Sequence, residues 1–219
     1  MNGKFLRLND IRARATHLFV IMTWCHVLFV ALVAIVARNE WLLPAAIAAA
    51  VALCATLFAR FIKDGLTLRS LIAVCMTFGP ILLVYAGRGH HSGWSGQGDW
   101  QIDYHMYFFG VFAMLAAYVD WRPIAIAAGL TAVHHLLLDL IFPSNVFPEE
   151  GLDRVLVHAL AVAVECGVLF WLTGAIDSLF KRIDDLIDFV SRETADQLQR
   201  EQEANAHLRR QLSVARAAE

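Results

Sequence analysis

Charged residues are scarce in this chain, and they are unevenly placed. They make up 17% of the 219 residues, whereas a typical soluble domain carries about 25%. Most of the charges lie at the two ends of the chain and in short breaks between apolar runs, and 58% of all residues are hydrophobic. This pattern excludes an ordinary soluble domain and predicts an integral membrane protein.

The sequence also lacks the motifs of several classes of function. The net charge of −2 and the absence of a basic stripe argue against a nucleic-acid partner. The four cysteines form no CxxC pair and lie inside apolar runs, so no disulfide framework is expected. GxSxG, HExxH and phosphate-loop motifs are absent, and we expect no catalytic residues and no enzymatic activity.

Six apolar runs each approach the roughly 20 residues that a helix needs to cross a bilayer. Helices are expected because backbone amides in lipid must be satisfied within their own segment. The runs are approximately 18–37, 41–60, 66–86, 102–119, 123–142 and 155–176. They predict an all-α fold in which residues 1–176 form a six-helix transmembrane bundle.

Lysine and arginine are distributed asymmetrically over the connections between these runs. One side receives Lys4, Arg7, Arg12, Arg14, Arg60, Lys63, Arg69, Arg122, Lys181 and Arg182, and the other receives Arg38, Arg88 and Arg154. Because positive residues favour the cytoplasmic side, we expect a multi-pass protein with both termini in the cytoplasm.

The composition changes after residue 176 to a charged, helix-favouring segment without Pro or Gly. Its apolar residues recur at near-heptad spacing, with polar interruptions at Thr194, Glu201 and Asn205. These apolar residues are Phe180, Ile187, Leu198, Leu208 and Leu212. We expect 177–219 to form a cytoplasmic coiled-coil helix that joins two copies into a homodimer; the alternative is a solvated helix without a partner.

Histidine recurs at a similar depth in three predicted spans. At 1.5 Å of rise per residue, His105 and His158 lie roughly 5 Å inside the outer ends of their spans. His134 and His135 lie roughly 10–12 Å inside theirs, and His26 lies near mid-membrane. The spacing therefore predicts imidazoles from the fourth, fifth and sixth spans at one level of the outer half.

Two carboxylates share helix faces with these histidines. Asp139 follows His135 by four residues, and Glu165 follows His158 by seven. Ionisable groups inside a span are costly unless paired, so they mark function by default. The alternative is that they only form hydrogen bonds between helices, and for His26 taken alone we prefer that alternative.

Two kinds of bound group suit this pattern. A b-type haem needs two axial imidazoles across a flat gap, for which His26, His105, His134, His135 and His158 are the candidates. A copper or zinc ion needs three or four converging ligands, for which the candidates are His105, His135, His158, Glu165 and Asp139. The spacing does not separate the two, although the small-residue stretches "AIAAGLTAV" and "AAIAAAVALCA" favour haem slightly.

Three stretches resemble the six-span input regions of certain bacterial chemoreceptors, histidine kinases and diguanylate cyclases. They are "IDYHMYFFGVFAMLAAYVDWRP", "AVHHLLLDLIFPSNVF" and "VHALAVAVE". The resemblance puts Asp103, His105, His135, His158 and Glu165 on motif positions. The chain departs from the pattern at Tyr107, where the motif has a second His, and at Val157, where it has Glu.

The resemblance implies a signal-transduction sensor in the bacterial inner membrane. A histidine-held cofactor in the outer half would pass a redox or ligand signal through the sixth helix to a cytoplasmic output module. Two other functions are possible from the sequence: a membrane haem oxidoreductase that transfers electrons, and a small-molecule transporter.

Overall fold

The computed structural model describes residues 7–88, 100–141 and 152–217, and within these ranges the chain is helical without a strand. The elements are α1 (Leu8–Val36), α2 (Leu42–Phe61), α3 (Leu66–Ala86), α4 (Trp100–Leu115), the short 3₁₀ helix η1 (Ala116–Tyr118), α5 (Trp121–Ile141) and α6 (Leu152–Ala217). The predicted all-α fold is confirmed. The chain divides into two compact units, Met1–Ala175 and Ile176–Glu219.

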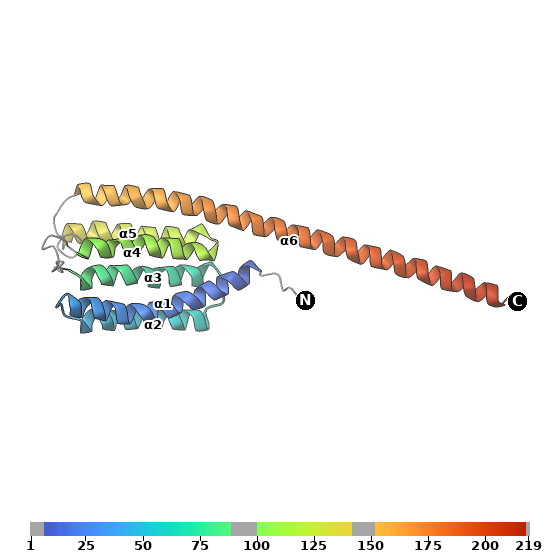
Figure 1. The fold of residues 1–219 in the computed structure, drawn as a ribbon, viewed down its shortest axis with the longest axis horizontal. Coiled ribbons are helices and arrows are strands. Elements are labelled where there is room, and N and C mark those ends of the chain that lie inside the picture. The colour runs from blue at the N-terminus through green and yellow to red at the C-terminus, as the bar shows by residue number, and fades with distance from the viewer. Residues whose placement is uncertain (1–6, 89–99, 142–151, 218–219) are drawn as a thin grey trace. The chain divides into compact units, whose positions relative to one another are not determined.

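The first unit is organised around α3. This helix packs against α1 and α2 on one side and against α4 and α5 on the other (Figure 1). Within its most apolar 18-residue window 67% of the residues are buried, against 33% for α1 and 28% for α2. Helices α1, α2, α4 and α5 are therefore positioned against α3.

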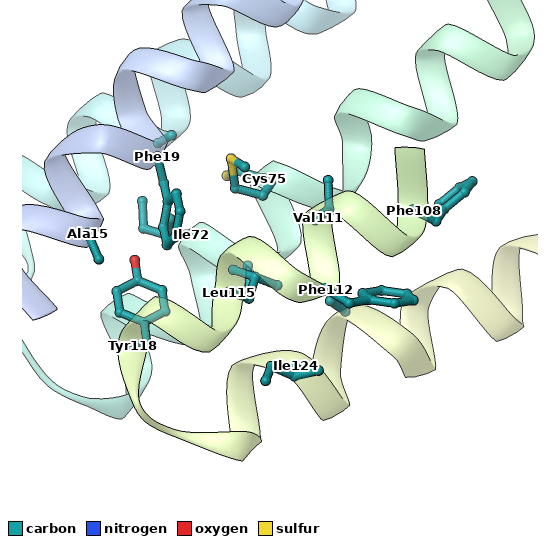
Figure 2. Close-up of a cluster of buried hydrophobic side chains, with 14 of the residues drawn as sticks. Ala15, Phe19, Ile72, Cys75, Phe108, Val111, Phe112, Leu115, Tyr118 and Ile124 are labelled. Carbon is teal, nitrogen blue, oxygen red and sulfur yellow. The ribbon is translucent and has the colours of Figure 1, made fainter. Parts of the chain in front are cut away.

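The main core lies where α1, α3, α4 and α5 meet. Figure 2 shows the labelled side chains gathered between the ribbons of these helices, including Phe19, Ile72 and Phe112. Tyr118 is the largest fully buried residue, and its hydroxyl is 3.1 Å from the hydroxyl of Thr16. A buried Tyr needs such a partner for its O–H, so η1 is fixed to α1 by both packing and a hydrogen bond.

Within the part of the chain that the structure describes, four helices are long and apolar enough to cross a membrane, namely α1, α2, α3 and the apolar part of α6. The exposed fractions of Leu28 (75%) and Phe61 (76%) fit a lipid-facing surface, because water would penalise such exposure. In contrast, α4 has only 16 residues, or about 24 Å at 1.5 Å per residue. The expected run 102–119 ends early because Val119 adopts a left-handed conformation with φ of 51°.

The turn between η1 and α5 is held by a group of charges that we call the Asp120 cluster: Arg12, Arg69, Asp120 and Arg122. The Asp120 carboxylate lies 3.2 Å from Nη1 of Arg69 and 2.8 Å from Nε of Arg122. Arg12 donates hydrogen bonds to the carbonyls of Tyr118 (2.9 Å) and Val119 (3.1 Å). Arg12 lies in α1, which begins ten residues before the predicted run because its first turns are too polar to register as a span.

The electrostatics of this turn favour the charged form of Asp120. Burial alone would raise the pKa of Asp120, but hydrogen bonds from Arg122 and the positive charges of Arg122 and Arg69 together lower it below its usual value. Both Asp120 and Arg69 are buried. The carboxylate is therefore the counter-charge that makes burial of Arg69 tolerable.

Candidate functional site

Three histidines from three helices meet at one place in the first unit. The ring centroid of His105 in α4 is 5.4 Å from that of His135 in α5 and 6.0 Å from that of His158 in α6. His105 and His135 are buried, and His158 is half-buried. The structure thus brings together the three imidazoles that the sequence placed at a common depth.

These three rings line one cavity of about 220 Å³ between α4, α5 and α6. Its other walls are mostly apolar, with the hydroxyl-bearing Thr131 among them. The remaining lining residues are Phe108, Phe109, Ala128, Ala132, Leu136, Ala159 and Val162. Such a setting, apolar with a few placed polar groups, is typical of a small-ligand site.

The rim of the cavity is exposed between α5 and α6. Ala132, Leu136 and Ala159 line the cavity and are also exposed on the surface of the first unit. They belong to apolar stretches of the two helices. If these stretches lie in a bilayer, the cavity opens toward lipid.

His135 has a defined tautomer. Its Nδ1 lies 2.8 Å from the carbonyl oxygen of Thr131, one turn earlier in α5. A carbonyl only accepts, so Nδ1 carries the proton and Nε2 carries the lone pair. An Nδ1–H···O=C bond of this kind is the usual support of a metal-binding histidine.

The enclosed part of the cavity is smaller than a haem. Haem has four pyrrole rings, whereas a cavity of about 150 Å³ holds a single benzene ring. The enclosed volume of about 220 Å³ has room for little more than one ring, so a haem held here would have to extend through the open side between α5 and α6.

A single metal ion suits the spacing of the rings better than their orientation. Metal–nitrogen bonds of about 2 Å place the centroids of two imidazoles on one ion roughly 5–6 Å apart, which is the spacing of His105 from both His135 and His158. Among the described residues no group of three His, Cys, Asp or Glu is arranged to bind an ion. The ring nitrogens of the three histidines therefore do not converge on one point in this structure. Rotation about the broad χ2 of histidine redirects the ring nitrogens, and a small shift of α6 toward α4 and α5 would complete their convergence.

The other two candidate histidines lie outside the cavity lining. His134 packs near His135 and Phe108, with ring centroids 5.3 and 6.3 Å away, and its Nε2 is buried without a hydrogen-bond partner among the described residues. His26 lies between α1, α3 and α4, where its Nε2 is 2.8 Å from the hydroxyl of Tyr107. This bond fits the interhelical role preferred for His26.

The candidate carboxylates are not placed in the cavity either. Glu165 is half-buried in α6, and its Oε2 is buried without a hydrogen-bond partner among the described residues. It follows Val162 by three residues along α6, beyond the cavity lining. The side chain of Asp139 lies outside the described residues.

Two features of the site were missed from the sequence. The partner of His135 Nδ1 is the backbone carbonyl of residue 131, which any residue type would supply, so the sequence held no signal for it. The His26–Tyr107 contact joins residues 81 positions apart, and no local pattern indicates it.

The chain matches no protein-family model, no curated protein and no solved structure.

Proposed function

We propose that this chain is a multi-pass sensor of the bacterial cytoplasmic membrane whose input site is the cavity between α4, α5 and α6. The observation that carries the proposal is the meeting of His105, His135 and His158, one from each helix, around a single apolar cavity. Burying an imidazole in an apolar span costs free energy unless it is paired, so such residues mark a functional site by default. The resemblance of the surrounding motifs to input regions of bacterial receptors supports the same conclusion.

The ligand that we propose is one copper or zinc ion held by the three imidazoles. Neutral imidazole suits both metals, and the bound ion would supply a positive charge that draws the ring nitrogens together. His135 presents its Nε2 lone pair because Thr131 holds the Nδ1 proton. His105 and His158 complete the set by rotating their rings.

The signal would leave the site through α6. This helix contains His158 and runs from Leu152 to Ala217 without interruption. Drawing His158 toward α4 and α5 changes the position of α6 in the bundle, and a cytoplasmic output module joined to the helix would receive that change. Both termini are proposed to be cytoplasmic.

A second copy of the chain is the proposed partner of the second unit. Within residues 176–190 the apolar side chains recur at helical spacing and are largely exposed, among them Leu179, Ile183 and Leu186. The polar positions of this stretch carry four Asp against one Lys and one Arg, and this acidic balance disfavours an anionic membrane surface. Pairing with another such helix would bury the stripe. The side chains of Leu208 and Leu212 lie outside the described residues.

The test is metal binding by purified, metal-free protein. We expect one Cu²⁺, Zn²⁺ or Co²⁺ per chain by elemental analysis, and about tenfold or greater loss of affinity in H105A, H135A and H158A. H17A is the matched control, because His17 is exposed on α1 and should leave binding unchanged. Full metal occupancy in all three variants would refute the ligand assignment. A Soret band in the purified protein would show that the bound group is haem and not a single metal ion.

A further inference from the structure

The face of α4 that turns away from the cavity is held by polar and aromatic contacts. Tyr107 pairs with His26 of α1, and their rings are perpendicular with centroids 5.5 Å apart. The hydroxyl of Tyr107 lies 2.8 Å from Nε2 of His26, and His26 is only 5% exposed. The pair is therefore a hydrogen bond inside the bundle, between α1 and α4.

Two glycines of the α3 region provide the space for these contacts. A Cβ added at Gly79 would overlap the His26 ring, and a Cβ added at Gly87 would overlap the ring of Tyr104. Any side chain larger than hydrogen would displace the rings. The rings of α1 and α4 thus fit into gaps that only glycine leaves open.

These contacts act on the part of α4 that lines the cavity, whereas Val111, Phe112 and Leu115 further along the helix pack in the main core. His105 and Tyr107 are two residues apart, which is about 200° around an α-helix. Holding Tyr107 against α1 therefore turns His105 toward α5 and α6, where the cavity lies. A rotation of α4 that broke the Tyr107 contact would move His105 out of the site.

We propose that Tyr107, through its hydrogen bond to His26 seated on Gly79, is a positioning residue that holds His105 in the metal site. This inference rests on the proposed function, because it assumes that His105 is a ligand. His26 and Tyr107 do not themselves touch the ion. Their effect passes through the rotation of α4.

The experiment measures Co²⁺ affinity and the visible ligand-field spectrum of the purified full chain. Y107F removes only the hydroxyl, and G79A leaves both polar side chains in place but adds the Cβ that displaces His26. Each should weaken Co²⁺ binding about tenfold, as the loss of a supporting partner does at metal sites, and should shift the spectrum toward that of H105A. The matched control is G129A, since a Cβ at Gly129 of α5 meets no atom within 4 Å.

A double variant separates positioning from general destabilisation. If Tyr107 acts only through His105, Y107F/H105A should bind Co²⁺ no more weakly than H105A alone. Additive losses of affinity in the double variant would overturn the inference. Wild-type affinity in both Y107F and G79A, with impaired binding in H105A, would also overturn it. Either result leaves the proposed metal site standing. Wild-type binding in H105A, H135A and H158A would instead refute the proposed function itself.

Discussion

At the scale of single residues, Asp120 is a buried carboxylate that is paired with two arginines. It is buried together with Arg69, and its carboxylate also accepts two hydrogen bonds from the Arg122 side chain, at 2.8 and 2.9 Å. Removing one partner of a buried ion pair leaves the other charge uncompensated. Arg122 matters less, because 47% of its side chain is exposed.

The variant D120N should lower the free energy of unfolding by about 3 kcal/mol or more. The measurement is thermal or denaturant unfolding in detergent. K181A removes the exposed pair between Lys181 and Asp177 and serves as the control, with an expected change within about 0.5 kcal/mol. A D120N protein as stable as K181A would show that the Asp120 cluster does not stabilise the fold.

The same carboxylate predicts a dependence on pH. Because the pKa of Asp120 is lowered by folding, its contribution is complete above the ordinary Asp pKa of about 3.9 and disappears as the pH falls through the lower value of the folded state. The stability difference between wild type and D120N should therefore be constant above about pH 4 and shrink below it. A difference that grew on acidification would contradict this assignment.

The candidate histidines show what a sequence can and cannot predict at this scale. Depth along a helix is obtained by counting residues, and the shared level of His105, His135 and His158 was predicted in this way. Direction around the helix depends on which neighbour packs where, so the sequence favoured an interhelical hydrogen bond for His26 but could not name its partner, Tyr107. Tyr107 was recognised only as a departure from a motif, since its partner lies on another helix.

At the scale of elements, the helix ends are determined by backbone conformation and capping hydrogen bonds, which hydropathy does not detect. The end of α1 has Arg38 in the left-handed region with φ of 59°. The Arg38 N–H donates to the carbonyl of Ile35 and the Asn39 N–H to that of Ala34, which is the Schellman arrangement. Glycine is the usual residue at this position because a Cβ is unfavourable there.

R38G should raise the free energy of unfolding by about 1 kcal/mol, because glycine has no Cβ to clash in the left-handed conformation of this exposed residue. R38A is the matched control: it removes the same side chain but keeps the Cβ, so no comparable gain is expected. Chemical denaturation of the two variants in parallel measures the difference. Equal stability of R38G and R38A would mean that the backbone at this helix end is not strained.

Helices α2, α3 and α5 lie within two residues of the expected apolar runs, and the run 66–86 coincides with α3. The early end of α4 was not predicted, because it depends on the conformation of Val119 and on the Asp120 cluster. Sequence alone also gave no indication that α3 is central. Its composition resembles that of α1 and α2, and its burial arises only when the other helices pack around it.

At the scale of the whole molecule, the proposal requires that events at His158 reach the second unit. Spin labels at Gln197, an exposed position of α6, on a background without native cysteines would report the distance between two copies. Loading with Zn²⁺ should change that distance by about 1–2 Å, the usual size of a helix shift. In H158A the distance should stay constant, and an unchanged distance in metal-loaded wild type would refute coupling through α6.

The exposed rim formed by Ala132, Leu136 and Ala159 has a kinetic consequence. A site that opens sideways into hydrocarbon exchanges its contents with the bilayer more readily than with the surrounding solution. Hydrophilic chelators would then strip the ion slowly even when equilibrium favours them, while lipophilic chelators of equal strength would strip it quickly. The lifetime of an ion in the proposed site would therefore depend on the membrane around the protein as well as on the strength of the metal–ligand bonds.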